Sequence, residues 1–235
     1  MSEGVVDPPV DADPWPTDDG AMSPTALTLA LAFAIGALGW TLAEYLLHRF
    51  LMHAMRGKGL ASREHLTHHA RRDYFAEAAQ KALFSVAATI VMVPVSALLL
   101  GLPHALVLQA GFLGMYLFYE WLHRRAHTHP PRGTYGRWLR RHHFHHHFGR
   151  PLLNQGVSTP FWDYVFRTNV EPGMIRVPRR MAMRWLLTPE GELDPAFAAD
   201  YVLVGQGPVG AAVVETPETV ALDTTAAYTN VPPTD

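Results

Sequence analysis

Residues 25–53 read TALTLALAFAIGALGWTLAEYLLHRFLMH, and this stretch contains both features that decide the fold. Its first part, residues 25–43, carries no charge and would extend about 28 Å as an α-helix, close to the thickness of a bilayer's hydrocarbon core. Its last part places two histidines, His48 and His53, at the end of that apolar segment. The stretch therefore predicts a membrane-spanning helix that ends in candidate metal ligands.

Two further stretches, residues 82–100 and 103–122, are also long and apolar enough to cross a bilayer. Hydrophobic residues make up 49% of the chain and charged residues only 17%, which favours a membrane protein over an average soluble domain. The chain has no cysteine, which excludes disulfides, thiolate-bound zinc and cysteine-held iron–sulfur clusters. The alternative for each apolar stretch is a buried helix of a soluble protein.

The distribution of basic residues argues against that alternative. All 19 Lys and Arg fall within residues 49–81 and 124–184, while the turn at 101–103 and the tail before residue 23 carry none. This is the positive-inside pattern, so we expect the N-terminus outside and both basic segments, with the C-terminus, in the cytoplasm. A signal peptide fits the first span poorly, because acids and no base precede it.

Composition divides the chain into three parts. Residues 1–22 are rich in Pro, Asp and Gly and predict a disordered acidic tail, after which Ser23 is a good helix N-cap. Residues 206–235 have the composition of a flexible tail. Residues 23–205 predict an all-α membrane domain with three, or at most four, membrane-spanning helices and a helical cap on the cytoplasmic side.

The fourteen histidines all lie within residues 48–147, mostly in four clusters. Side chains three or four residues apart share one face of a helix, so HX2HH and HX3H each direct their imidazoles toward one point. An HX4H pair would lie about 140° apart on an α-helix, so we expect it at a helix end or divided between two metals. The first three clusters are His48 and His53 (HX4H), His65, His68 and His69 (HX2HH), and His123 and His127 (HX3H).

The fourth cluster lies in RHHFHHHF, residues 141–148, and two registers satisfy HX2HH. The expected topology brings all four clusters to the same membrane face, where they would supply about ten nitrogen ligands, enough for two metals. A loose chelating tract is the alternative for the fourth cluster alone. His104 and His129 are interpreted as lying outside the site. The two registers are His142, His145 and His146, or His143, His146 and His147.

Two acidic residues lie one helical turn before a histidine cluster. Glu44 precedes His48 by four residues, and Glu120 precedes His123 by three. We expect each carboxylate to accept the second N–H of a metal-bound imidazole. A salt bridge to a neighbouring arginine is the alternative.

The order of these clusters resembles the fatty acid hydroxylase superfamily, which includes fatty acid 2-hydroxylases, sterol desaturases and C4-methyl oxidases, and carotenoid hydroxylases. The segments EYLLHRFLMH (44–53), YEWLH (119–123) and NQGVSTPFWD (154–163) agree with it, and the resemblance covers about residues 27–185. It favours the second register, because an aromatic residue follows the paired histidines in the family, as Phe148 does here. The implied ligands are His48, His53, His65, His68, His69, His123, His127, His143, His146 and His147.

The resemblance implies a dinuclear iron centre, which zinc can occupy in purified protein, and O2 as co-substrate. Asn154 is a candidate for holding a metal-bound water, or it caps a turn. The family usually has four membrane helices with both ends cytoplasmic, whereas three are counted here. Since the chain contains no cytochrome b5 domain, the implied electron donor is a separate ferredoxin-like or cytochrome b5-like protein with its reductase.

The implied activity is hydroxylation of a C–H bond in a lipid, a fatty acyl chain or a related lipid. A carotenoid or sterol hydroxylase or desaturase is the alternative with the same metal site, although the HX3H third box argues against the carotenoid group. A membrane metal-binding or transport protein is an alternative of another class. It would need ionisable residues inside the spans, which contain almost none. No feature indicates a nucleic-acid partner.

Overall fold

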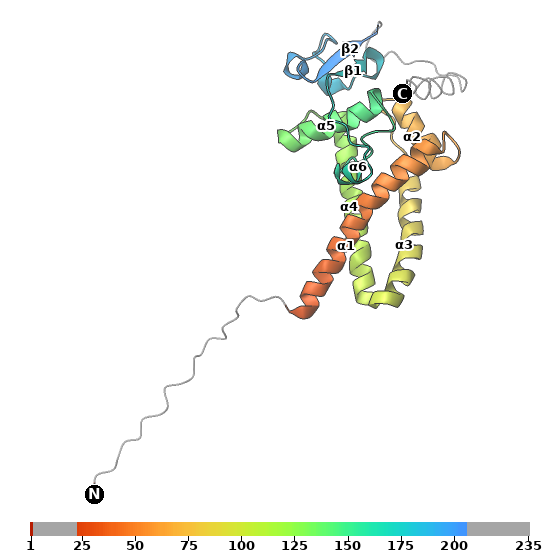
Figure 1. Ribbon diagram of the computed structural model, residues 1–235, viewed down its shortest axis with the longest axis vertical. Coiled ribbons are helices and arrows are strands. Elements are labelled where there is room, and N and C mark those ends of the chain that lie inside the picture. The colour runs from red at the N-terminus through yellow and green to blue at the C-terminus, as the bar shows by residue number, and fades with distance from the viewer. Residues whose placement is uncertain (2–22, 206–235) are drawn as a thin grey trace.

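The computed structural model describes residue 1 and residues 23–205, so the tails expected at 1–22 and 206–235 lie outside the described residues apart from Met1. A bundle of three long helices stands at one end of the molecule, and shorter elements cover the other end (Figure 1). The long helices are α1 (Pro24–Leu46), α3 (Ala78–Leu100) and α4 (Leu102–Thr128). The covering elements, called the cap, are η1 (Leu47–Ala54), α2 (Leu60–Ala70), α5 (Gly133–Phe148), α6 (Phe161–Val165), β1 (Ile175–Pro178), β2 (Tyr201–Val204), and the short 3-10 turns η2 (Arg179–Met181), η3 (Arg184–Leu186) and η4 (Pro195–Phe197).

The expectation of three apolar helices is confirmed for residues 23–205, where three helices are long and apolar enough to cross a membrane. Ser23 caps α1 as expected, with its Oγ accepting a hydrogen bond from the N–H of Ala26 at 3.2 Å. α3 has no buried residue and presents apolar side chains all round, which suits lipid better than water. α3 meets α4 at Gly101, whose φ of 79° lies in the left-handed region that favours glycine.

α1 crosses α4 at a distance that only glycine permits. A Cβ added to Gly36 would lie 1.9 Å from the backbone oxygen of Leu108, and one added to Gly111 would lie 2.1 Å from that of Phe33. No non-bonded carbon can approach an oxygen so closely, so the two glycines let the backbones touch, as small residues do between membrane helices. This crossing fixes α1 against α4 below the cap.

An aromatic cluster fills the space between that crossing and the cap. The Trp40 ring lies 5.3 Å from the ring of Phe112, 4.7 Å from that of Tyr116 and 5.5 Å from that of Tyr119, between ring centroids. All four side chains are buried. They hold the upper halves of α1 and α4 in a fixed relation, and the histidine-bearing segments begin immediately above them.

The all-α prediction needs one correction, because the cap also contains a small parallel sheet. β1 and β2 pair with Ile175 opposite Tyr201, and both residues pack with Phe144 of α5 in a second core. Each strand has only four residues, too few for an alternating pattern to be recognised in the sequence. The fold is therefore mostly helical, with a two-stranded sheet that packs against α5.

Candidate metal centre

Ten histidines gather where the cap meets the bundle, and they form two groups of five. Within each group the candidate ligand nitrogens all lie within 4.8 Å of one another. These are the ten histidines that the resemblance implied as ligands. We call the groups site A, made of His48, His53, His65, His69 and His146, and site B, made of His68, His123, His127, His143 and His147.

Two segments supply one group each. η1 gives His48 and His53 to site A, and α4 gives His123 and His127 to site B. The α4 pair is four residues apart and therefore shares one face of the helix.

The other two helices supply both groups. On α2, His65 and His69 share a face toward site A, while His68 is rotated by about 100° from His69 and belongs to site B. α5 does the reverse, giving His146 to site A and both His143 and His147 to site B. The two sites are adjacent, because the rings of His69 and His147 stack with their centroids 4.0 Å apart.

The HX4H pair shares one group because its backbone is not an α-helix. Residues 47–54 form a π-helix that continues α1 without a break. Hydrogen bonds in a π-helix run from residue i to i+5, which brings residues five apart near one face. His48 and His53 are both buried and have ring centroids 5.0 Å apart. The 140° separation expected from α-helical geometry therefore does not occur.

The nitrogen spacing in site A fits a shared cation. The Nε2 atom of His53 lies 2.9 Å from Nε2 of His65 and 2.9 Å from Nε2 of His146. Nitrogens that bind one metal at about 2.1 Å, at right angles to each other, lie about 3.0 Å apart. Site B contains the same spacing, since Nε2 of His127 and Nε2 of His143 are 2.9 Å apart.

Site B also contains buried nitrogens that need a partner. Nδ1 of His68 donates to the backbone oxygen of Tyr74 at 2.8 Å, so its Nε2 carries a lone pair. Among the described residues, Nε2 of His68, His123 and His147 meets no hydrogen-bond partner. A buried polar atom without a partner costs about 1–3 kcal/mol, and a metal ion would remove that cost.

Burial keeps these imidazoles neutral and able to bind a metal. It lowers the pKa of His68 from 6.5 to about 4, although the hydrogen bond to Tyr74 opposes the shift. Burial also lowers the pKa of His143 and of His147 well below 6.5, and neighbouring imidazoles add to the effect. At neutral pH their lone pairs are therefore free to coordinate.

Backbone carbonyls orient two of the site A rings. His48 Nδ1 lies 2.5 Å from the oxygen of Gln155, and His146 Nδ1 lies 3.0 Å from the oxygen of Leu153. Each contact fixes the ring so that Nε2 points into site A. We call residues 153–158 the carbonyl loop.

Two buried carboxylates hold the carbonyl loop, which corrects the expected role of Glu44. Its side chain accepts from the N–H groups of Val157 at 2.5 Å and Ser158 at 2.9 Å, and from the Ser158 hydroxyl, instead of from an imidazole. Asp163 accepts from the N–H groups of Gln155 and Gly156, each at 2.8 Å. Glu44 therefore acts on His48 only through the carbonyl loop. Its carboxylate binds the N–H groups of Val157 and Ser158, and the Gln155 carbonyl of the same loop contacts His48.

The expected roles of Glu120 and Asn154 are corrected as well. Glu120 forms an ion pair with Lys81 of α3, the basic side chain that faces it across the helix pair. The Asn154 side chain donates to the oxygen of Val170 at 2.9 Å and accepts from its N–H at 2.7 Å. Asn154 thus closes the loop, with φ of 54°, which agrees with the alternative role of capping a turn.

The geometry of α5 separates the two registers of the fourth cluster. His143, His146 and His147 belong to sites A and B, whereas His142 and His145 belong to neither. His142 Nε2 instead lies 3.3 Å from a carboxylate oxygen of Asp163. His104 and His129 also lie outside both groups.

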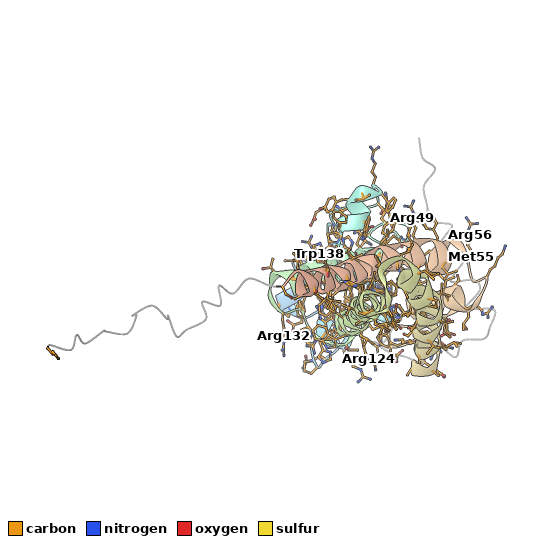
Figure 2. The ribbon with its side chains drawn as sticks, turned by 90° about the horizontal axis from the view of Figure 1, so that it is seen from below. Arg49, Met55, Arg56, Arg124, Arg132 and Trp138 are labelled. Carbon is orange, nitrogen blue, oxygen red and sulfur yellow. The ribbon has the colours of Figure 1, made fainter. Side chains whose placement is uncertain are left out.

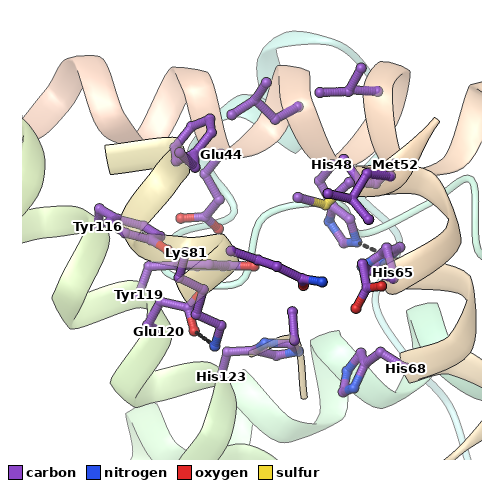
Figure 3. Close-up of a pocket in the computed structure, with 18 of the residues that line it drawn as sticks. Glu44, His48, Met52, His65, His68, Lys81, Tyr116, Tyr119, Glu120 and His123 are labelled. Carbon is purple, nitrogen blue, oxygen red and sulfur yellow. Dashed lines mark hydrogen bonds and ion pairs between the residues drawn. The ribbon is translucent and has the colours of Figure 1, made fainter. Parts of the chain in front are cut away.

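A cavity of about 350 Å³ reaches both sites. His48 and His65 of site A and His68 and His123 of site B lie on its wall, and Figure 3 shows them around its open centre. The other side carries the paired Lys81 and Glu120 with Tyr116 and Tyr119. Most of the remaining wall is apolar, and it comes from α1, η1, α2, α3 and the segment between α2 and α3.

Several supporting residues give little sign of their role in the sequence. Leu153, Gln155 and Tyr74 act through backbone oxygens, which no side-chain pattern reveals. Asp163 lies in the segment NQGVSTPFWD that resembled the family, and that segment was the available signal for it. Lys81 ends the first basic segment and differs from the other basic residues only by its contact with Glu120.

These features define a helical protein of membrane type with a candidate two-metal histidine centre beside an apolar cavity. Residues 33–168 match the family model described as Fatty acid hydroxylase. The chain therefore belongs to the fatty acid hydroxylase family.

Individual relatives agree with this assignment. The chain is 33% identical to a fatty acid 2-hydroxylase of Rattus norvegicus over 58% of its own length, and 33% identical to a dihydroceramide fatty acyl 2-hydroxylase of Arabidopsis thaliana over 60%. It covers 38% of the rat protein and 61% of the plant protein. A solved structure titled "Full length scs7p (only hydroxylase domain visible)" superposes with a TM-score of 0.54 at 30% identity, covering 63% of this chain and 58% of that one.

Proposed function

We propose that this protein is an O2-dependent lipid hydroxylase whose dinuclear iron centre is held by the ten histidines of sites A and B. The observation that carries the proposal is that both five-nitrogen groups meet one apolar cavity. Zinc would fit the same nitrogen donors in purified protein. When bound, the two iron ions would supply the O2 activation and C–H oxidation that no side chain here performs.

The cavity supports an acyl chain as the substrate. Leu51, Leu60 and Leu83 line it and are also exposed at the surface, so it opens between η1, α2 and α3. In a bilayer this opening would face lipid at the level where the spans meet the cap. An acyl chain would then enter without crossing water, and its head group would stay near the basic residues of the cap.

Parts of the cavity wall would limit charge and water around the acyl chain, although the carboxylates of Glu44 and Glu64 also line it. The Lys81–Glu120 ion pair neutralises two charged groups in the wall. Tyr116, Tyr119 and Trp40 close the end toward the bundle. The carbonyl loop keeps the His48 and His146 rings directed into site A, so the ligands would need little rearrangement to hold the metal.

The relatives favour a fatty acyl substrate over a carotenoid or sterol, because the rat and plant proteins are fatty acid and fatty acyl 2-hydroxylases. Electrons would come from a separate donor protein. The charge map supports a cap on the cytoplasmic side and an N-terminus outside.

Lipid mass spectrometry tests this proposal. Cells that produce the protein should gain one oxygen atom in one acyl-lipid class compared with cells that lack it. His127→Ala should abolish the gain, because His127 belongs to site B. His129→Ala is the matched control, since His129 is exposed and outside both sites, and it should keep the product. A lipid profile that the protein leaves unchanged would refute the proposed activity.

A further inference from the structure

The short helix α6 leaves an aromatic and aliphatic face uncovered. Tyr164 is 64% exposed and Phe161 is 57% exposed, and Val165 and the following Phe166 are exposed as well. A contiguous apolar patch of this kind on a monomer indicates an interaction surface.

α6 packs on a segment of α1 that belongs to the first candidate span. The indole N–H of Trp162 donates to the hydroxyl of Thr41 at 3.0 Å, and the ring of Phe166 stacks on Tyr45 with centroids 4.9 Å apart. Both α1 residues fall within the candidate span Thr25–Ala54. Seen from below, α6 (teal) lies on the side of α1 that faces away from α3 and α4 (Figure 2).

The α6 face continues a stripe of exposed apolar residues on α1. Leu38 lies three residues before Thr41 and seven before Tyr45, so the three share one face of the helix. Leu38 is exposed, and so is Leu31 a further seven residues back. α6 therefore covers the upper end of this stripe, at Thr41 and Tyr45, while the lower part of the stripe would contact lipid. At the upper end the outer face of α6 would contact lipid in place of the α1 residues that it covers.

The depth of α6 agrees with a position at the membrane boundary. Thr41 lies 18 residues after Ser23, or about 27 Å along the helix axis, against a hydrocarbon core of about 30 Å. Aromatic residues gather at this level in membrane proteins, because their rings suit the boundary between acyl chains and head groups. The face is thus apolar and aromatic at the depth where lipid would meet it.

We propose that α6 is seated in the lipid interface beside α1, with Phe161, Tyr164 and Val165 against the bilayer. The proposal rests on the bundle spanning a membrane, as the proposed function requires. It gives the bilayer a physical link to site A, because Asp163 of α6 holds the N–H of Gln155, and the Gln155 carbonyl orients His48. A partner protein or a second copy bound to this face would instead exclude lipid from it.

Single introduced cysteines can test whether α6 lies in the lipid interface, since the chain contains no cysteine of its own. The full chain would carry Tyr164→Cys, labelled with an environment-sensitive fluorophore and reconstituted in phosphatidylcholine vesicles. Val91→Cys on the exposed face of α3 is the control for the bilayer interior, and Glu190→Cys in the cap is the control for water. Quenching would be measured with nitroxide lipids labelled near the head group or near the chain end, and with aqueous iodide.

The proposal predicts that the label at 164 is quenched most by head-group nitroxides and is protected from iodide relative to the label at 190. Iodide quenching equal to that at 190 would overturn it. Protection from iodide without nitroxide quenching would also overturn it, and would indicate a protein partner. If the label at 91 is not quenched by chain-end nitroxides, the bundle does not cross the bilayer, and the interfacial position of α6 is refuted as well. If only the interfacial position of α6 is refuted, the gain of one oxygen atom in the cellular lipids, which tests the proposed function, should still be observed.

Discussion

Replacing Asp163 with Asn is a direct test of how the carbonyl loop supports site A. The Asp163 carboxylate accepts from the N–H of Gln155 on one oxygen, and from the N–H of Gly156 on the other. The Thr168 hydroxyl also donates to the first oxygen, at 2.7 Å. Burial alone would raise its pKa, but the hydrogen bonds from His142, Thr168 and these N–H groups outweigh burial and lower it. The carboxylate is therefore ionised and buried.

The cost of the Asp163→Asn substitution can be built from these contacts. The amide keeps one oxygen for Gln155 and Thr168, but its NH2 group faces the N–H of Gly156. One charge-assisted hydrogen bond is lost, at about 1.5–3 kcal/mol, and a buried N–H is left unpaired, at about 1–3 kcal/mol. Together these two terms should lower the free energy of unfolding by about 2.5–6 kcal/mol. Because the Gln155 carbonyl would shift, metal affinity at site A should fall about 10–100-fold.

Purified protein would be titrated with metal in competition with a chelator, and its thermal unfolding followed in the same detergent. Glu190→Gln is the matched control, an exposed carboxylate in the cap. The Asp163→Asn protein should unfold earlier and lose affinity at one of its two sites, with the other retained. Unfolding and metal binding both equal to those of the control would refute the role assigned to the carbonyl loop.

Two further predictions follow from packing and burial. Gly36→Ala should disrupt the α1–α4 crossing, since its Cβ would lie 1.9 Å from the Leu108 oxygen. Gly114→Ala is the control and should fold normally, because there is open space around Gly114. Equal yields of the two folded proteins would contradict this prediction. Metal-free protein should lose stability as pH falls from about 6.5 toward 4, because the unfolded chain protonates His68 near 6.5 and the folded one near 4. A flat stability profile across that window, measured by denaturant unfolding, would contradict it.

The spans and the histidine clusters could be predicted because they depend on local pattern. Length, hydropathy and charge placed the three helices, although α1 and η1 run on to Ala54, beyond the charge-free stretch that ends at Ala43. The same periodicity placed His123 and His127 on one face of α4, where the structure has them. It failed at His48 and His53, because the 3.6-residue period does not describe a π-helix.

The support around the histidines could not be read from local pattern, because it comes from distant residues. Glu44 meets Val157 and Ser158, more than a hundred residues away in the chain. Glu120 meets Lys81 on another helix. Spacing placed each carboxylate about one helical turn from a histidine in the sequence, but its actual partner depends on which loop or helix packs against it. The small sheet was missed for the same reason, since Ile175 and Tyr201 pair only after the chain has returned to α5.

The metal content of the purified chain tests the central claim most directly. Protein from iron-supplemented cells should hold two metal ions per chain, one in each five-nitrogen group. His53→Ala in site A and His127→Ala in site B should each lower that content, whereas His104→Ala, outside both groups, should keep it at two. One metal ion or none in the unmodified protein, or a full complement in both site variants, would contradict the account of a dinuclear centre.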